Sequence, residues 1–118
     1  MSTAAELVAQ TKTRIREVTP DEVAKSRDKF VIIDVREPDE YVAGHIPDVA
    51  HIPRGLIESE VDKHPLLCDR DMALVLHCRS GGRSALATFA LQELGFKNVS
   101  NMTGGLCAWE AAGLPISK

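Results

Sequence analysis

An apolar run that ends at a cysteine, followed by a glycine-rich loop, places the tightest constraint on this fold. Residues 72–76 form the run, Cys78 closes it, and residues 79–84 hold two glycines, two arginines and two serines. The apolar periodicity of residues 85–94 then predicts a helix. This order indicates a strand, a tight loop and a helix, with a thiol at the point where the strand ends.

The loop is expected to surround this thiol with positive charge. Its successive N–H groups can form an anion-binding nest, the helix N-terminus adds partial positive charge, and Arg79 and Arg83 add full charges. Each of these features favours the thiolate, so the pKa of Cys78 is expected below that of a free thiol. A small buried cysteine at a strand end is the alternative, which the glycines and arginines disfavour. The predicted anion-binding residues are Arg79, Ser80, Gly81, Gly82, Arg83 and Ser84.

Strand and helix patterns alternate along the rest of the chain. Residues 30–34 form an apolar run closed by Asp34, which is typical of a strand buried on both faces of a parallel sheet. Such alternation predicts a single α/β domain in which ligands bind beyond the carboxyl ends of the strands. Asp34 and Cys78 are therefore expected to share one site. We expect strands at 15–18, 30–34, 50–52, 72–76 and around Val99, and helices at 20–24, 37–42, 56–61, 85–94 and 105–113.

Length, charge and cysteine spacing exclude several classes of protein. A chain of 118 residues suits one domain, and its net charge of −3 argues against a nucleic-acid partner. No apolar run approaches the length of a membrane span, and the N-terminus lacks the apolar region of a signal peptide. The odd number of widely spaced cysteines indicates a reducing, cytoplasmic setting, and no metal or cofactor is expected. Residues 1–14 are expected to form an extension with a short helix, and residues 15–118 the folded domain.

Several side chains are expected to be structural. Cys68 and Cys107 lack a glycine and arginine loop and are expected to be packing residues, although Cys68 could serve as a resolving thiol if the fold brought it near Cys78. The expected core residues of the helix at 85–94 are Leu86, Phe89, Ala90 and Leu94.

The histidines are expected to support the fold. Because successive strand side chains point to opposite faces, His77 is expected to be a packed or hydrogen-bonded histidine and not the general base for Cys78. His45 belongs to a turn, and Trp109 is expected in the core. The remaining two, His51 and His64, are expected at the surface or in hydrogen bonds.

Taken together, these motifs resemble the single-domain rhodanese, or thiosulfate sulfurtransferase-like, family across about residues 15–115. The resemblance implies a three-layer fold with a mainly parallel, five-stranded sheet between helices. Asp48-Val49 replaces the family's usual Gly-Ala, and aspartate is among the few residues that tolerate positive φ. The matching segments are Asp34-Val35-Arg36-Glu37, Glu40-Tyr41, Gly44-His45-Ile46-Pro47, Ile52-Pro53, residues 78–84, Gly104-Gly105 and Ala108-Trp109.

The resemblance also implies roles for individual residues. Cys78 corresponds to the nucleophile that takes sulfane sulfur from thiosulfate or a related donor and passes it, as a persulfide, to a thiol or cyanide acceptor. Asp34 and Arg36 match an Asp-x-Arg motif that we expect to brace the loop through charged hydrogen bonds. Arg79 is expected to meet the sulfonate end of the donor. Arg83 is expected to bind the donor or to brace the loop, for which it could pair with Asp34.

Two other functions stay open at this stage. The dual-specificity phosphatases that share this fold, and arsenate reductases, need a loop wide enough for a tetrahedral oxyanion, with five residues between cysteine and arginine. Only four residues separate Cys78 from Arg83, which favours the smaller persulfide sulfur. A sulfur-relay module that serves a protein partner would keep the same cysteine, so the sequence does not separate an enzyme from a carrier.

Overall fold

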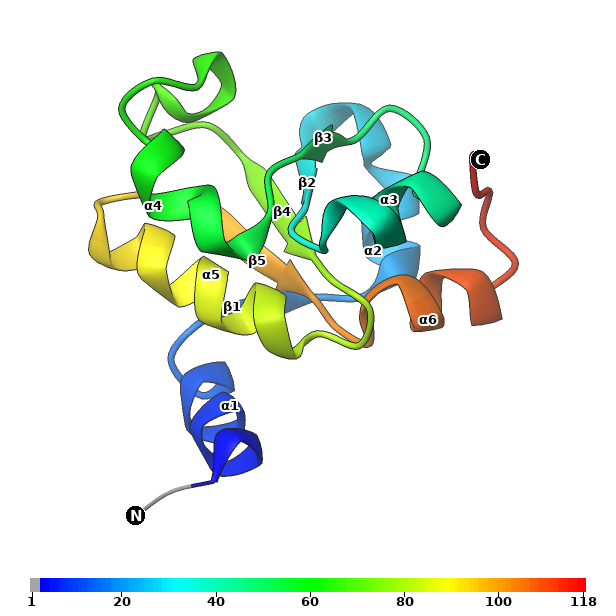
Figure 1. The fold of residues 1–118 in the computed structure, drawn as a ribbon, viewed down its shortest axis with the longest axis horizontal. Coiled ribbons are helices and arrows are strands. Elements are labelled where there is room, and N and C mark those ends of the chain that lie inside the picture. Colours follow the sequence, from blue (N-terminus) through cyan, green and yellow to red (C-terminus); the bar gives the residue numbers. More distant parts are fainter. Residues whose placement is uncertain (1–2) are drawn as a thin grey trace.

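A five-stranded sheet forms the middle layer of the fold, with every neighbouring pair of strands parallel (Figure 1). The computed structural model describes residues 3–118, and the strand order is β1-β5-β4-β2-β3. This architecture confirms the α/β class and the parallel sheet predicted from the sequence. The strands are β1 (Arg16–Val18), β2 (Val31–Asp34), β3 (Ala50–His51), β4 (Leu74–His77) and β5 (Val99–Met102).

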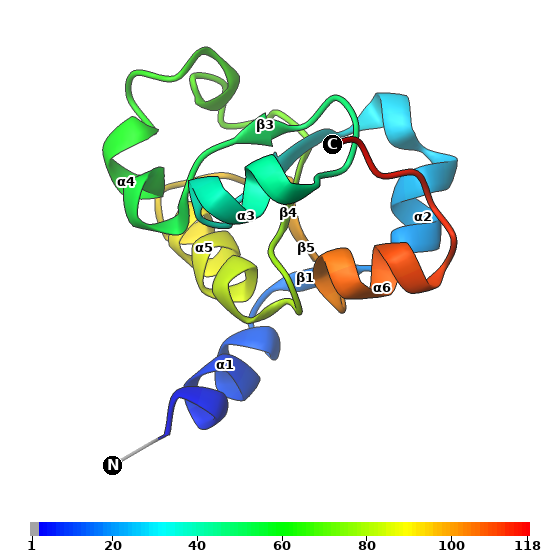
Figure 2. The ribbon, with the colours of Figure 1, turned by 45° about the vertical axis from the view of Figure 1, so that its right-hand side comes forward.

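Helices cover both faces of this sheet, and one helix projects from the body (Figure 2). The helices are α1 (Ala4–Lys12), α2 (Pro20–Lys25), α3 (Pro38–Ala43), α4 (Ile57–Glu60), α5 (Gly82–Glu93) and α6 (Gly105–Ala111), with 3₁₀ turns at Arg27–Lys29, Arg54–Leu56 and Pro65–Leu67. Helices α4 and α5 pack on one face, and α2 and α6 pack on the other. Among the described residues, no helix is long and apolar enough to cross a membrane.

The core explains why the central strands read as continuous apolar runs. On β4, Leu74 and Leu76 pack toward α5, while Val75 packs toward α6. On β2, Ile33 and Ile32 divide in the same way between the two clusters. Because both faces of the sheet are covered, successive residues are buried on opposite sides and the two-residue alternation disappears from the sequence.

Local signals set several element boundaries as predicted. Thr19 caps α2, since its side chain accepts a hydrogen bond from the Glu22 N–H, and Pro20 occupies the first helical position. Gly95 follows α5 with φ of 97°, and the Phe96 N–H donates to the Leu91 carbonyl. Asp48 adopts φ of 60°, so the turn tolerates aspartate there.

The burial predicted for α5 is wrong. Its fully buried side chains include Ala87 and Leu91, whereas Leu94 is 41% exposed. The expected core residues Leu86, Phe89 and Ala90 are only partly buried and line a cavity of about 480 Å³ shared with α1. The helix therefore buries Ala87 and Leu91 and places Leu86 and Phe89 on the side that faces the N-terminal helix.

The N-terminal extension reaches the loop that follows Cys78. Helix α1 packs against α5, and a Cβ added to Gly82 would lie 3.7 Å from Val8 Cγ2. A Cβ added to Gly81 would lie 3.7 Å from Lys12 Nζ. The expected short helix is present in the extension, and the part of that prediction that concerns residues 1–2 lies outside the described residues.

Candidate active site

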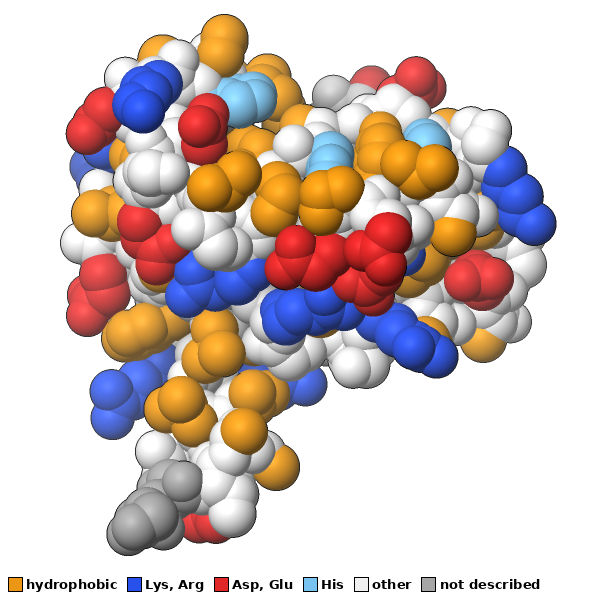
Figure 3. Space-filling model, viewed as in Figure 1, with side chains coloured by type: hydrophobic (Ala, Val, Ile, Leu, Met, Phe, Trp, Pro, Cys, Tyr) orange, Lys and Arg blue, Asp and Glu red, His pale blue; other side chains and the backbone are white. Residues whose placement is uncertain are grey.

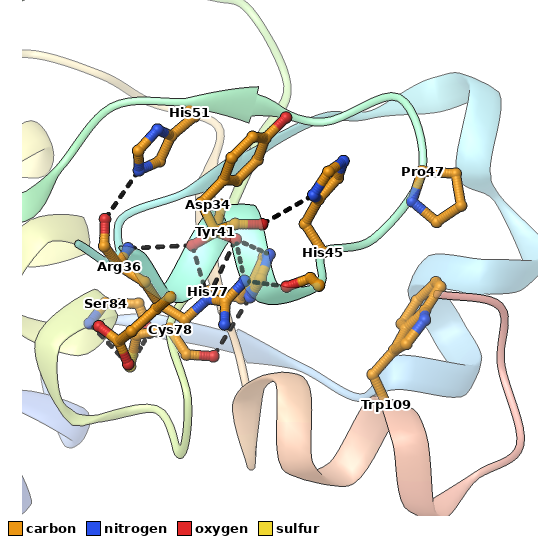
Figure 4. A network of polar contacts seen from close by, with 12 residues as sticks. Asp34, Arg36, Tyr41, His45, Pro47, His51, His77, Cys78, Ser84 and Trp109 are labelled. Carbon is orange, nitrogen blue, oxygen red and sulfur yellow. Dashed lines mark hydrogen bonds and ion pairs between the residues drawn. The ribbon is translucent and has the colours of Figure 1, made fainter. Parts of the chain in front are cut away.

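Cys78 lies at the carboxyl end of β4 and begins the loop that leads into α5 (Figure 4). Its sulfur accepts hydrogen bonds from the Gly81 N–H at 3.1 Å and the Ser84 N–H at 3.5 Å. The Ser84 hydroxyl oxygen lies 3.4 Å from the same sulfur. The cysteine is only 1% exposed, so the loop and the first turn of α5 enclose the thiol with polar hydrogens.

These neighbours change how readily the thiol ionises. Burial raises the pKa of Cys78, but the N–H groups of Ser84, Gly81 and Ser80 lower it, and the pKa lies below its ordinary value. The direction agrees with the expectation from the sequence, and N–H groups of the expected nest hydrogen-bond to the sulfur, whereas the arginine side chains do not. Arg83 adds Coulombic attraction while it hydrogen-bonds elsewhere.

Two glycines allow α6 to close the loop from the far side. The Leu106 N–H donates to the Cys78 carbonyl at 2.8 Å, and the Cys107 N–H donates to the Arg79 carbonyl at 3.0 Å. Gly105 adopts φ of 56°, and a Cβ there would lie 2.7 Å from the Arg79 carbonyl oxygen. A side chain at this position would therefore push α6 away from the loop, which gives a physical reason for the Gly104-Gly105 pair.

Asp34 and Arg36 form a buried ion pair beside this loop. Arg36 Nη2 lies 2.8 Å from Asp34 Oδ2, and Nε is 3.1 Å from both carboxylate oxygens. Nη2 also donates to the Gly44 carbonyl at 2.6 Å. The guanidinium thus ties the end of β2 to the turn after α3, and within the described residues no hydrogen bond joins it to residues 79–84.

His77 connects that ion pair to the cysteine. Its Nδ1 lies 3.2 Å from the Cys78 carbonyl oxygen, and its Nε2 lies 3.8 Å from Asp34 Oδ2 without a hydrogen-bond partner among residues 3–118. Burial lowers the pKa of His77, although the Asp34 carboxylate opposes that effect. The ring is therefore a neutral, packed side chain that donates to the carbonyl, as expected for a structural histidine.

Arg83 does not pair with Asp34, contrary to the expectation from its position. Its guanidinium binds both oxygens of Glu40 on α3, at 2.6 and 3.0 Å. A side-chain hydrogen bond from Arg83 lowers the pKa of Glu40 to about 2. The partner of Asp34 is instead Arg36, which follows it by two residues just after the end of β2.

Arg79 occupies the outer side of the loop, as expected. Its side chain is exposed and lines a surface pocket of about 290 Å³ together with Glu40 and Cys107. Figure 3 shows acidic and basic side chains next to one another on the face that carries α3 and α5. An anionic ligand at this surface therefore meets Arg79, which has no ion-pair partner among residues 3–118, more readily than Arg83, which Glu40 already holds.

The other cysteines are not packing residues, since Cys68 and Cys107 are both exposed. The Cys68 thiol donates to the His64 carbonyl at 3.3 Å, in the turn that precedes β4. Cys68 therefore lies before the amino end of β4, whereas Cys78 lies at the carboxyl end of that strand. Cys107 lies on α6 next to the loop, since its N–H donates to the Arg79 carbonyl.

An aromatic stack that no sequence pattern indicated lies beside the buried ion pair (Figure 4). Tyr41 lies between His45 and His51, with ring centroids 4.0 and 4.3 Å apart. His51 Nε2 bonds the Arg36 carbonyl at 2.8 Å, and His45 Nδ1 bonds the Tyr41 carbonyl at 2.9 Å. The residues come from three separate elements, and their order along the chain carries no sign of the stack.

A polar chain on the other side of the sulfur was also missed. Ser84 Oγ donates to Asn101 Oδ1 at 2.6 Å, and Asn101 Nδ2 donates to Glu17 Oε2 at 2.9 Å. Asn101 Nδ2 also lies 3.3 Å from the Gly81 carbonyl. Asn101 and Glu17 face one another because β5 and β1 pair in register, which joins residues 84 positions apart.

A buried thiol ringed by backbone donors, at the carboxyl edge of a parallel sheet and the N-terminus of a helix, defines a cysteine-loop α/β domain. The chain belongs to the Rhodanese-like domain family, whose match covers residues 19–112. This membership confirms the resemblance seen in the sequence motifs. Helix α1 lies outside the matched segment.

Individual relatives support the family assignment. A protein of Allochromatium vinosum named a sulfurtransferase is 38% identical over 86 residues, which cover 73% of this chain and 77% of that protein. The putative sulfur carrier protein YrkF of Bacillus subtilis is 38% identical over 84 residues, which cover 71% of this chain and 43% of that protein. The solved structure of RPA3614 from Rhodopseudomonas palustris, a protein of unknown function described as a possible tyrosine phosphatase, superposes with a TM-score of 0.89 at 31% identity and covers 99% of this chain and 96% of its own.

Proposed function

We propose that this protein is a sulfurtransferase that moves sulfane sulfur from thiosulfate or a related donor to a thiol or cyanide acceptor, through a persulfide on Cys78. The family and the sulfurtransferase and sulfur-carrier names of its relatives support sulfur transfer in general. The observation that carries the specific proposal is the position of the Cys78 sulfur, 3.1 Å from the Gly81 N–H and 3.5 Å from the Ser84 N–H.

The reaction needs one activated thiol and an anion-binding loop. The Cys78 thiolate attacks the sulfane sulfur, a new S–S bond forms, and the donor's S–S bond breaks as sulfite leaves with its electron pair. The terminal sulfur of the persulfide carries the negative charge, which the N–H groups of residues 79–84 stabilise. The acceptor then attacks that sulfur and releases the Cys78 thiolate.

The charged residues divide the supporting work. The exposed Arg79 binds the sulfonate end of the donor, while Arg83 holds the start of α5 against Glu40. Asp34 and Arg36 brace the site indirectly, because they fix the Gly44 turn and lie beside His77, whose ring contacts the Cys78 carbonyl. No cofactor enters this scheme.

Intact-mass spectrometry after incubation with thiosulfate tests the proposal. We expect one added sulfur atom on the wild-type chain and on Cys107→Ser, and none on Cys78→Ser. Cys107 is the matched control because it is an exposed thiol beside the same loop. Equal labelling of Cys78→Ser would move the nucleophile to another cysteine.

A sulfur-relay role differs from an enzyme of small molecules in what happens after the persulfide forms. We expect rapid thiosulfate-dependent formation of thiocyanate from cyanide if the acceptor is a small molecule. A stable persulfide with slow turnover would instead indicate a carrier for a protein partner, as the name of the Bacillus subtilis relative suggests for that protein.

The likeness to RPA3614 makes a phosphatase the second candidate. The loop disfavours it, because only four residues separate Cys78 from Arg83 and Glu40 already occupies the Arg83 guanidinium. We expect no Cys78-dependent hydrolysis of p-nitrophenyl phosphate. Hydrolysis by the wild type that is lost in Cys78→Ser would favour the phosphatase.

A further inference from the structure

The Ser84 hydroxyl has one hydrogen and two neighbours that could accept it. Its oxygen lies 3.4 Å from Cys78 Sγ and 2.6 Å from Asn101 Oδ1. A hydroxyl donates only one hydrogen bond, and O–H···O bonds are strongest at about 2.7 Å. The hydrogen therefore points to Asn101, and the hydroxyl oxygen turns its lone pairs toward the sulfur.

The surroundings of Asn101 leave its amide only one orientation. Its nitrogen lies 2.9 Å from Glu17 Oε2 and 3.3 Å from the Gly81 carbonyl oxygen, and both of these groups accept hydrogen bonds. A flipped amide would set its carbonyl oxygen against a carboxylate and a second carbonyl, while Ser84 is itself able to donate or accept. The carbonyl oxygen of Asn101 must face Ser84, and Ser84 must donate.

We propose that Asn101, oriented by Glu17, is a positioning residue that turns the hydroxyl hydrogen of Ser84 away from Cys78. Only the backbone N–H groups then stabilise the thiolate, which keeps it more basic and, since thiolate nucleophilicity falls as basicity falls, more nucleophilic. In the persulfide the charge moves to the terminal sulfur, so Cys78 Sγ needs no hydroxyl donor. This consequence for sulfur transfer rests on the proposed function; the orientation of the hydroxyl does not.

Other groups around the sulfur also influence its ionisation, so the test must compare variants that leave them unchanged. The donors to the sulfur come from its own loop and from α5, and the neighbouring strands and the N-terminal helix lie around that loop. The charged or titratable groups on these elements are Arg79, Arg83 with its partner Glu40, His77 with Asp34 and Arg36 beside it, Lys12 near Gly81, and Glu17.

The experiment measures the rate of iodoacetamide alkylation at Cys78 against pH in the full chain, by mass spectrometry of the peptide that contains it. We expect Asn101→Ala to lower the midpoint by about half to one pH unit, because the released hydroxyl then donates one hydrogen bond to the thiolate. In a Ser84→Ala background, we expect Asn101→Ala to leave the midpoint unchanged, because the hydroxyl through which it acts is gone.

Thr88→Val is the matched control. Thr88 is buried on the same helix, and its hydroxyl donates to the Ser84 carbonyl at 2.8 Å. We expect its midpoint to equal that of the wild type. Because this assay uses no sulfur donor, its result is separate from that of the persulfide test.

Several outcomes would overturn the proposal. An unchanged or raised midpoint in Asn101→Ala would mean that the Ser84 hydroxyl is not withheld from the sulfur. Equal shifts with and without the Ser84 hydroxyl would mean that Asn101 acts by holding Gly81. If Asn101→Ala does not fold, Ser84→Ala decides alone: we expect no rise in its midpoint, and a rise would show that the hydroxyl serves the thiolate.

Discussion

Two arginine–carboxylate pairs flank the Cys78 loop, and they differ in how far water reaches them. The side chains of Arg36 and Asp34 are 6% and 0% exposed, whereas those of Arg83 and Glu40 are 37% and 27% exposed. Both are short, with closest N···O distances of 2.8 and 2.6 Å. Distance alone would rank them as equals, so burial decides what each contributes.

The buried pair sets the structure, and the outer pair adjusts the charge that a ligand meets. Breaking a buried pair leaves the remaining charge without a partner in a medium of low dielectric constant, which is strongly destabilising. An exposed pair exchanges its partner for water and contributes little net stability. Glu40 therefore matters less for folding than for neutralising Arg83 beside the thiol.

The largest expected effect comes from breaking the buried pair. We expect Arg36→Ala to lower the free energy of unfolding by about 3–5 kcal/mol, because Asp34 is left buried and the Gly44 carbonyl loses its donor. Chemical denaturation measures this loss. Arg54→Ala is the control, since Arg54 belongs to an exposed pair with Glu58, and a loss in Arg36→Ala no larger than in the control would remove the distinction between the pairs.

The pH dependence of the unfolding free energy tests the buried region through His77, which lies beside Asp34. Burial holds the folded-state pKa of His77 below its ordinary value of 6.5. Below pH 6.5, His77 therefore binds a proton more readily in the unfolded chain than in the folded one. Stability should be complete above pH 6.5 and fall as the pH decreases below it. Denaturation of wild type and His77→Gln between pH 7 and 5 would show this, and parallel slopes would mean that His77 does not cause the loss.

The Arg83–Glu40 pair contributes less to stability, and it should lose that contribution at a lower pH than His77 does. The folded-state pKa of Glu40 is about 2, compared with an ordinary value of 4.5, so its stabilisation is present above pH 4.5 and disappears as the pH falls toward 2. Exposure limits this contribution to about 1 kcal/mol or less. We expect the difference in unfolding free energy between wild type and Glu40→Gln to shrink over that range, and a constant difference would contradict it.

The smallest effect on stability is expected for Arg79. Its side chain is exposed, so Arg79→Ala should keep the wild-type melting temperature while it raises the KM for thiosulfate about tenfold, as expected for the loss of one charged hydrogen bond. Arg83→Ala should also melt near the wild type, because its partner is Glu40 and not a buried carboxylate. A large drop in the melting temperature of Arg83→Ala would reverse the comparison.

Features encoded within a few residues were predictable from the sequence. The strand before Cys78, the glycine-rich loop and the start of α5 are contiguous, so their chemistry could be inferred before their geometry. The alternation of strands and helices likewise predicted the parallel sheet. The Thr19 capping box set the start of α2 by contacts three residues apart.

Features that depend on distant partners were not predictable. The partner of Arg83 lies 43 residues away on α3, and its carboxylate has no sequence signature that distinguishes it from its acidic neighbours. Leu86 and Phe89 of α5 were assigned to the core because they are apolar. They face α1 instead, and α1 lies outside the matched family segment. Asn101 gained its role only through the pairing of β5 with β1.

The pairing of β1 with β5 also sets the order in which this site can form during synthesis. β1 is the first strand to be made, and its partner is the last. Contacts between such distant segments form slowly, since a long loop must close before they gain any stability. A nascent chain that already contains Cys78 therefore waits for β5 before Asn101 can reach Ser84, and a chain that terminates before residue 99 would leave the edge of β4 uncovered and open to pairing with another chain.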